Sequence, residues 1–123
     1  MNFIKKKKYK KVLCFDIDGV ICKTNKNDYK SAEPILESVK MINKLYNHNF
    51  YIKLFTARFM GRNSDNCQKA KNEGLILTKK QLKTWGVKYH KLLMCKPSYD
   101  LFVDDKALNF KKNWQVLLQK KLF

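Results

Sequence analysis

Residues 12–19 have the sequence Val-Leu-Cys-Phe-Asp-Ile-Asp-Gly, an apolar run that leads into two aspartates and a glycine. A short continuous apolar run with these boundaries is typical of a buried strand, which we place at Val12 to Ile17. Asp16 and Asp18 are then expected at the carboxyl end of that strand. This stretch predicts an α/β domain whose first strand ends in acidic side chains.

The rest of the chain alternates between helix-like and strand-like patterns. Apolar residues recur at helical spacing from Ile35 to Tyr46, and Thr78 with Gln81 forms a capping-box pattern that predicts a helix start. Such alternation predicts a three-layer, Rossmann-like domain with a parallel sheet. The other predicted strands are Phe50–Phe55, Lys88–Met94 and Leu101–Val103. The predicted helices cover residues 35–46, 65–73 and 78–86 and the tail through Trp114 and Leu118. Polar connections are expected at residues 23–30 and 57–66.

The chain has 123 residues, of which 45% are hydrophobic, so we expect one modest core and a single domain at residues 12–123. A basic leader at residues 1–11 precedes it. This leader is a flexible arm, a nuclear-targeting-like patch or a solubilising end, and we favour the last interpretation.

The net charge of +17 arises from 27 Lys and Arg against 10 Asp and Glu. Such an excess favours anionic partners, including nucleic acid and phosphorylated sugars. However, 25 of the 27 basic residues are Lys, and the chain is also rich in Asn, Ile, Phe and Tyr. This pattern fits a compositional bias of the coding sequence with lysines spread over solvated faces, and we favour it over a dedicated nucleic-acid surface.

Several absences narrow the class of protein. No apolar run approaches the roughly 18 residues of a membrane-spanning helix, and the basic leader is not followed by a small-residue cleavage site. We therefore expect a cytoplasmic protein with no membrane partner. The cysteines form no C-x-x-C pair and are expected as reduced thiols. They are Cys14, Cys22, Cys67 and Cys95.

Two acidic pairs follow predicted strands, Asp16 with Asp18 and Asp104 with Asp105. The carboxyl ends of parallel strands open onto one edge of the sheet, so both pairs are expected to meet there. Clustered carboxylates repel one another unless a cation holds them together. Mg²⁺ prefers oxygen ligands of this kind and leaves room for a substrate phosphate, so the four aspartates predict a magnesium site.

Two further residues are expected at the same edge. The hydroxyl of Thr56, after the second strand, can donate to a phosphoryl oxygen, and Lys96 precedes the last predicted strand. A carboxylate nucleophile, an acid/base, a metal and donors for developing charge are the groups that phosphoryl transfer requires.

The segments Asp16-Ile17-Asp18-Gly19-Val20, Thr56-Ala57-Arg58, Lys96-Pro97 and Val103-Asp104-Asp105 resemble, in order, the four motifs of the haloacid dehalogenase superfamily. The resemblance covers residues 12–109. The run from Tyr89 through Lys96-Pro97-Ser98-Tyr99-Asp100 to Ala107 further resembles small capless members found with capsule or surface-polysaccharide biosynthesis genes. The gaps between the motifs leave no room for a cap domain.

The resemblance implies a phosphatase in which Asp16 attacks phosphorus and forms an aspartyl-phosphate, while Asp18 protonates the leaving oxygen and later activates water. It also implies Mg²⁺ held by the Asp16 side chain, the Asp18 backbone carbonyl and Asp104, with Asp105 as a ligand or its neighbour. Thr56 and Lys96 would hold the transferring phosphoryl group.

Three functions remain open. The preferred one is hydrolysis of a small sugar or polyol phosphate, the second is a polynucleotide end phosphatase, and the third is a noncatalytic binding or regulatory module with the same fold. An open site is covered either by a second subunit or by a large substrate. Arg58 and Arg62, the two arginines of the chain, follow Thr56, and a guanidinium suits phosphate or carboxylate recognition. Either one of them reads an anionic or polyol part of the substrate or both are solvated loop residues.

Overall fold

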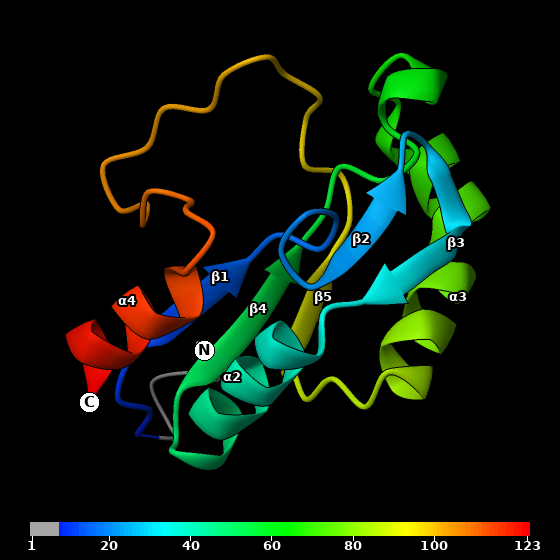
Figure 1. Ribbon diagram of the computed structural model, residues 1–123. Coiled ribbons are helices and arrows are strands. Elements are labelled where there is room, and N and C mark those ends of the chain that lie inside the picture. Colours follow the sequence, from blue (N-terminus) through cyan, green and yellow to red (C-terminus); the bar gives the residue numbers. More distant parts are fainter. Residues whose placement is uncertain (1–7) are drawn as a thin grey trace.

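The computed structural model describes residues 8–123, so residues 1–7 of the basic leader lie outside the described part of the chain (Figure 1). Its main sheet has, within those residues, three parallel strands in the order β1–β4–β5. They are β1 (Val12–Phe15), β4 (Tyr51–Phe55) and β5 (Lys91–Leu93). The register pairs Leu13 with Ile52 and Leu54 with Leu92. The chain is thus a mixed α/β protein, as predicted, and the arrangement is consistent with a Rossmann-like fold.

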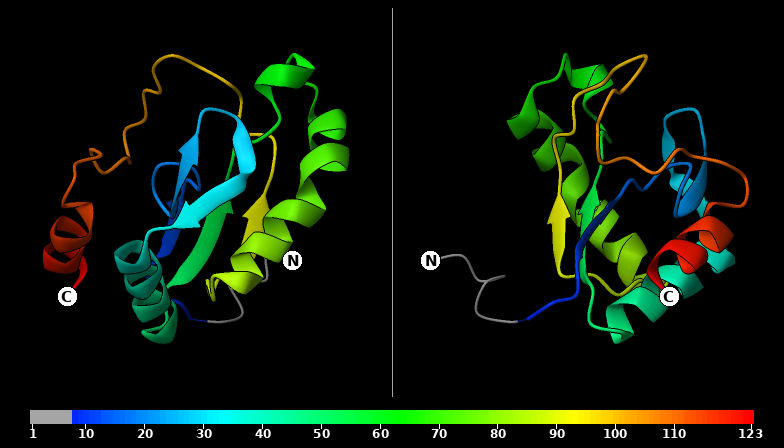
Figure 2. Two further views of the ribbon diagram at one scale, coloured as in Figure 1. Left: turned by 45° about the vertical axis from the view of Figure 1, so that its right-hand side comes forward. Right: turned by 90° about the vertical axis from the view of Figure 1, so that its left-hand side faces the viewer.

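The helix α2 (Leu36–Asn47) and the C-terminal helix α4 (Trp114–Leu122) confirm two of the predicted helices. Both contribute to one hydrophobic core with the sheet, through Ile42 and Leu45 of α2 and Trp114 and Leu118 of α4. Figure 2 shows these two helices on the same side of the strands. None of the helices formed by residues 8–123 has the length and apolar character needed to cross a membrane.

The opposite face of β1 is open. Val12 is 44% exposed and Cys14 is also exposed, although both lie in a strand. Side chains in a strand alternate between faces, so Leu13 and Phe15 point to the core while Val12 and Cys14 point away from it. The third layer of the predicted three-layer arrangement is not formed over this strand by residues 8–123.

One helix replaces the two that the sequence predicts at 65–73 and 78–86. The helix α3 runs without a break from Cys67 to Thr84. Its N-cap is Asn66, whose side chain accepts a hydrogen bond from the backbone N–H of Lys69 at 3.0 Å. The predicted capping pattern at Thr78 is not used because Thr78 is buried in the middle of this helix. Gly86, with φ +72°, lies two residues beyond its end, in the conformation that follows many helices.

A β-hairpin occupies the segment predicted to be a polar connection. The strands β2 (Cys22–Asn25) and β3 (Asp28–Pro34) pair antiparallel around a turn in which Lys26 has φ 53°. The turn residues Asn25, Asn27 and Asp28 are of the types that favour such bends. The prediction is wrong because most side chains of this hairpin are exposed, so it carries little hydrophobic alternation.

The predicted strand Leu101–Val103 is absent, and this prediction is also wrong. Leu101 is 81% and Val103 85% exposed, and residues 94–113 run outside the sheet (Figure 1). A strand needs a neighbouring strand to pair with its backbone N–H and C=O groups, and a run of three residues forms few such hydrogen bonds. The strand predicted at 88–94 is shortened to β5, residues 91–93.

Candidate functional site

The carboxyl ends of the strands meet around Thr56, which follows β4. The backbone N–H of Thr56 donates to the carbonyl oxygen of Leu93 at 3.0 Å, and the backbone N–H of Lys96 donates to the Thr56 carbonyl oxygen at 3.1 Å. This hydrogen bonding fixes Lys96 beside the strand ends. As a result, the Lys96 ammonium lies 3.7 Å from a carboxylate oxygen of Asp16, at the end of β1. The structure therefore brings together Asp16, Thr56 and Lys96, as predicted from sequence.

Asp16 is only partly accessible to solvent. Its carboxylate accepts a hydrogen bond from the Ile17 backbone N–H at 2.8 Å. Burial raises the pKa of Asp16 above its ordinary value, and the opposing effects of Lys96 and of the Ile17 bond are smaller. Asp16 is thus a carboxylate whose negative charge is incompletely stabilised by the protein.

Lys96 is enclosed by aromatic rings. Its ammonium nitrogen lies 5.1 Å from the ring centre of Phe102 and 5.3 Å from that of Tyr99. Burial by itself lowers the pKa of Lys96, but a hydrogen bond to Tyr99 and the charge of Asp16 raise it more, so the net shift is upward. Lys96 therefore remains a cation next to Asp16.

The carboxylate of Asp18 is held by Arg58. Arg58 Nε lies 3.2 Å from Asp18 Oδ1 and 3.0 Å from Asp18 Oδ2, and Nη2 donates to Oδ1 at 3.0 Å. Thr24 of the hairpin also donates its hydroxyl to Asp18. These contacts fix the orientation of Asp18 two residues after Asp16.

Arg58 does not face the opening of the site. It is 1% exposed, and its remaining guanidinium nitrogen donates to Thr78 and Gln81 of α3. Its guanidinium also lies 5.1 Å from the ring centre of Tyr29. With these protein partners and this burial, Arg58 positions Asp18, so the prediction that one of the two arginines reads the substrate is left to Arg62.

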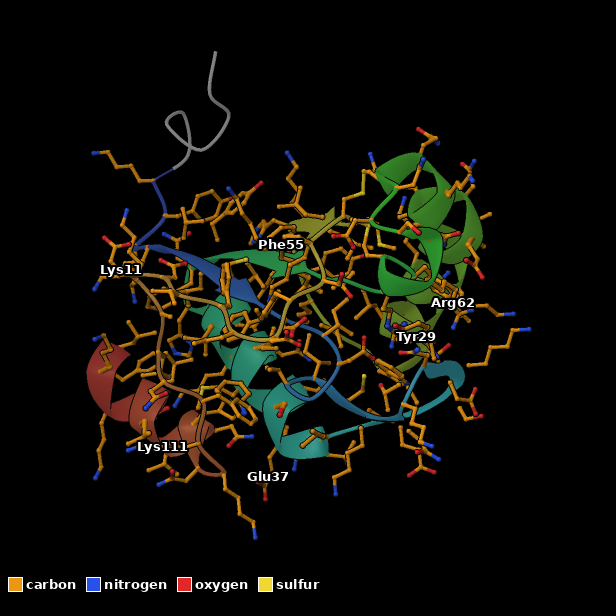
Figure 3. The ribbon with its side chains drawn as sticks, turned by 90° about the horizontal axis from the view of Figure 1, so that it is seen from above. Lys11, Tyr29, Glu37, Phe55, Arg62 and Lys111 are labelled. Atoms are coloured by element: carbon orange, nitrogen blue, oxygen red, sulfur yellow. A yellow bond between two sulfur atoms is a disulfide. The ribbon has the colours of Figure 1, made fainter. Side chains whose placement is uncertain are left out.

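Arg62 behaves differently. It is partly exposed, donates to Glu73 of α3 at 3.1 Å and to the backbone carbonyl of Asn27 at 3.0 Å, and so ties the hairpin tip to the helix. Figure 3 shows Arg62 next to Tyr29 of the hairpin. Its assignment as a substrate contact stays a prediction.

Asp104 and Asp105 are exposed and are not gathered with the other aspartates. Within residues 8–123, no three His, Cys, Asp or Glu side chains are close enough together to hold a metal ion. Asp104 accepts a hydrogen bond from the backbone N–H of Lys106 at 2.9 Å. In the part of the chain that the structure describes, Asp104 and Asp105 therefore lie outside any ligand cluster.

The oxygen ligands available at the end of β1 fit Mg²⁺ in part. The Asp16 carboxylate and the Asp18 backbone carbonyl are hard oxygen donors, while the Asp18 side chain is already occupied by Arg58. Mg²⁺ keeps several water ligands and is often held by one or two carboxylates together with a substrate phosphate. The residues at the end of β1 fit the ion in this restricted sense, and Asp104 or Asp105 would have to approach them.

An open cavity of about 360 Å³ contains the Asp16 and Lys96 side chains. The hairpin forms one wall, and the segment after Lys96 forms the other. Its lining residues are Asp16, Asn27, Tyr29, Ala57, Gly61, Lys96, Pro97, Ser98 and Tyr99. Its size is that of a small-molecule site.

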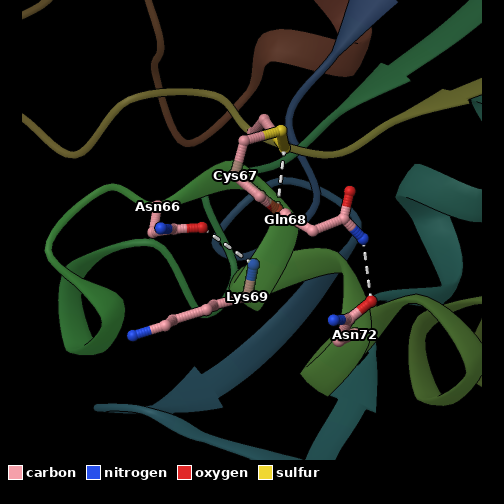
Figure 4. Close-up of a disulfide and its surroundings, with 6 residues drawn as sticks. Asn66, Cys67, Gln68, Lys69 and Asn72 are labelled. Atoms are coloured by element: carbon pink, nitrogen blue, oxygen red, sulfur yellow. Dashed lines mark hydrogen bonds between the residues drawn. A yellow bond between two sulfur atoms is a disulfide. The ribbon is translucent and has the colours of Figure 1, made fainter.

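A disulfide between Cys67 and Cys95 joins the first turn of α3 to the residue before Lys96 (Figure 4). The Ser98 hydroxyl donates to Asp65 at 2.7 Å and ties the same two segments together a second time. The prediction of four reduced thiols is therefore wrong for this pair, while Cys14 and Cys22 are free. Spacing along the chain could not reveal the pair, because the two cysteines are 28 residues apart.

Other residues of the site have no clear signal in the sequence. Cys22 lies against Asp18 and Arg58, and burial raises its pKa to about 11, so it is a neutral thiol. Gln81 donates to the Tyr29 backbone carbonyl from across the site. Only the folded hairpin brings these groups to Asp18.

The fold of this chain is shared with chains in solved structures. No family model and no curated protein matches the chain. The crystal structure of a structural-genomics target from Vibrio cholerae matches with a TM-score of 0.75 and 25% identity, over 90% of this chain and 98% of that chain. The fold is shared.

Two structures of the Pnkp1/Rnl/Hen1 RNA repair complex also contain similar chains. One matches with a TM-score of 0.55 and 18% identity, over 94% of this chain and 34% of that chain. The other gives a TM-score of 0.50 and 14% identity, over 92% and 30%. The present chain thus corresponds to about a third of those larger chains and shares a fold with that part.

Proposed function

We propose that this chain is a capless member of the haloacid dehalogenase superfamily that hydrolyses phosphomonoesters through Asp16. The observation that carries the proposal is the pairing of the Asp16 carboxylate with the Lys96 ammonium at 3.7 Å inside an open cavity. Asp18 lies two residues further on and is held by Arg58. A nucleophile, a cation and a second carboxylate are the minimum for transfer through a covalent intermediate.

In the proposed reaction, a carboxylate oxygen of Asp16 forms a bond to phosphorus while the bond from phosphorus to the ester oxygen breaks. For this step Asp18 must be in its protonated form, and it gives that proton to the departing oxygen. Asp18 then takes a proton from water, which attacks phosphorus and releases inorganic phosphate and free Asp16. The incomplete stabilisation of the Asp16 charge leaves its oxygen available for attack, and Lys96 offsets charge on the phosphoryl oxygens.

A bound Mg²⁺ would neutralise charge on the transferring phosphoryl group. The Asp16 side chain and the Asp18 backbone carbonyl would hold it from one side, and Asp104 or Asp105 from the other. Thr56 is fully buried, and its hydroxyl oxygen accepts a hydrogen bond from the Arg58 backbone N–H at 3.1 Å. In the proposed reaction, the hydroxyl proton of Thr56 would be donated to a phosphoryl oxygen.

The preferred substrate is a small sugar or polyol phosphate. The cavity is lined by Tyr29 and Tyr99, whose rings suit the flat face of a sugar ring, and its volume suits a small molecule. Because the cavity is open, a second subunit or the substrate itself would cover it.

A polynucleotide end phosphatase is the second candidate. The observations that favour it are the charge of +17 and the fold shared with chains of an RNA repair complex. Release of phosphate from sugar phosphates, compared with release from 3′-phosphorylated oligonucleotides at equal concentration, separates the two candidates.

The test of the proposed function is a phosphatase screen over a panel of phosphate esters with Mg²⁺ present. The Asp16→Asn variant keeps the shape of the side chain and removes the attacking oxyanion, so turnover should fall to background. Asp100→Asn, an exposed aspartate four residues after Lys96, is the matched control and should keep native turnover. Native turnover by the Asp16→Asn variant would refute the assignment of the nucleophile.

A further inference from the structure

The cavity with Asp16 has a neighbour. A second cavity of about 370 Å³ lies between the hairpin and α3. Both cavities are lined by Asn27 and Tyr29, so they adjoin at the hairpin tip. Figure 3 shows Tyr29 and Arg62 side by side at this junction. A ligand that extends from Asp16 past Tyr29 would therefore reach the second cavity.

The wall between the cavities is fixed by contacts from three directions. Gln81 of α3 donates to the Tyr29 backbone carbonyl at 2.6 Å, and Arg62 donates to the Asn27 backbone carbonyl at 3.0 Å. The Tyr29 ring packs against Phe59, with ring centres 4.7 Å apart. A wall held in this way is formed before any ligand arrives, which reduces the entropic cost of binding.

The second cavity has balanced charges. Arg62 is paired with Glu73 at 3.1 Å, and the other two charged residues of its lining are Asp28 and Lys30, again one of each sign. A hydrogen bond from Asn63 and the neighbouring Arg62 lower the pKa of Glu73, so this carboxylate stays an acceptor over the physiological range. Despite the net charge of the chain, this cavity lacks the cationic excess that a second phosphate would need.

Apart from Asn27, the remaining lining consists of Phe59 and Leu77 beside the Tyr29 ring, and the Arg62 guanidinium lies 4.8 Å from the ring centre of Phe59. Aromatic side chains next to carboxylate oxygens suit a neutral ring that carries hydroxyl groups, because the hydroxyls donate to the carboxylates and the ring packs against the aromatic side chains. A polynucleotide would instead bring a further phosphate with each ring.

We infer that the second cavity binds a sugar ring of the leaving group, next to the phosphorylated sugar at Asp16, so that the preferred substrate is an oligosaccharide phosphate with at least two rings. This inference rests on the proposed function of the Asp16 cavity. Displacement in line with Asp16 directs the leaving group away from the nucleophile, and the second cavity adjoins the Asp16 cavity at Asn27 and Tyr29.

The experiment measures binding and turnover separately. Calorimetry with the Asp16→Asn protein compares a monosaccharide phosphate, a disaccharide phosphate and a 3′-phosphorylated dinucleotide. We expect the disaccharide phosphate to bind about tenfold more tightly than the other two, as one stacked, hydrogen-bonded ring would provide. Equal affinity for the mono- and disaccharide phosphates, or tighter binding of the dinucleotide, would overturn the inference.

Two tryptophan variants locate the effect. Leu77→Trp fills the second cavity and should bring the preference for the disaccharide phosphate close to one. Ile76→Trp, at the neighbouring position of α3 that is 83% exposed, is the matched control and should keep the preference. Loss of the preference in both variants or in neither would place the second ring elsewhere.

The two proposals fail in different ways. If the native protein hydrolyses none of these esters while the Asp16→Asn protein still prefers the disaccharide phosphate, the phosphatase function is wrong and the sugar subsite stands. If the native protein hydrolyses all three with equal kcat/KM, the phosphatase function stands and the subsite is wrong.

Discussion

Removal of the disulfide gives the strongest quantitative prediction for the folded state. The bond joins Cys67 and Cys95 across a sequence separation of 28 residues. In the chain-entropy model, closing a loop of this length stabilises the folded protein by about 3.6 kcal/mol. For a chain of 123 residues, the corresponding decrease in melting temperature is about 14 °C. The substitution Cys67→Ser should produce this loss.

The assay is urea unfolding of the native and Cys67→Ser proteins, each with and without dithiothreitol. Dithiothreitol should destabilise the native protein to the level of the variant and leave the variant unchanged. Cys14→Ser, which removes an exposed free thiol, is the control and should keep the dithiothreitol effect. Thiol titration of the unreduced, unfolded native protein should find two free thiols rather than four.

The same substitution should also affect the site, because Cys95 directly precedes Lys96. Cys95 has φ 77°, a left-handed conformation that an ordinary side chain adopts only when its surroundings hold it there. Without the disulfide, the hydrogen bonds from Ser98 to Asp65 remain as the second tie between the segments. We therefore expect a reduced kcat rather than a complete loss. Identical unfolding curves before and after reduction would refute the reasoning.

Three further predictions concern Asp16, Gly74 and Arg58. Burial raises the pKa of Asp16, so ionisation of Asp16 opposes folding as the pH rises through that pKa, and Asp16→Asn should keep or raise the melting temperature at pH 7. Because the proposed attack needs the ionised carboxylate, turnover should fall with decreasing pH, and this fall should begin at a higher pH than the ordinary pKa of an aspartate would give. A Cβ at Gly74 would lie 2.1 Å from Phe59 Cδ2. Gly74→Ala should therefore lower the free energy of unfolding in urea by about 1 kcal/mol or more, although alanine has the better helix propensity. Gly61→Ala, at a position with open space around it, is the control and should be neutral. Arg58→Lys cannot reproduce the two-pronged contact with Asp18 and should lower kcat about 100-fold with little change in KM, and a parallel change in both constants would contradict a positioning role.

The parts of the fold that the sequence predicts well are those in which the local pattern and the tertiary environment agree. Phe15 of β1, Ile52 and Leu54 of β4, and the apolar positions from Val39 to Leu45 face the common core, so the apolar pattern of these positions coincides with their burial. Parallel pairing then places Asp16 near Lys96 without further information.

The wrong predictions share a different cause. Gly74 and Thr78 resemble helix boundaries locally, yet α3 continues through both because Gly74 admits the Phe59 ring and Thr78 binds Arg58. The hairpin at 22–34 is held by Gln81 and Arg62, which come from distant positions in the chain. Contacts of this kind have no periodic signal in the sequence.

The candidate site follows the same division. Asp16 and Thr56 directly follow β1 and β4, whose apolar runs are visible in the sequence, and Lys96 is held by its backbone hydrogen bond to Thr56. The segment with Asp104 and Asp105 depends on a strand at 101–103, and the three-residue apolar run that predicted that strand stays exposed. The positions of Asp104 and Asp105 were therefore predicted wrongly together with that strand.

Arg58 shows what an arginine can do in this chain that a lysine cannot, although its guanidinium does not face the opening of the site. One guanidinium contacts Asp18 at the end of β1, Thr78 and Gln81 of α3, and the ring of Tyr29 in the hairpin. A lysine has one nitrogen and no planar group, so it cannot make these contacts at the same time. In a chain with 25 lysines, the arginine two residues after Thr56 therefore indicates a site where a planar cationic group is required. That requirement is met inside the protein, by the carboxylate that the proposed reaction needs in a fixed orientation.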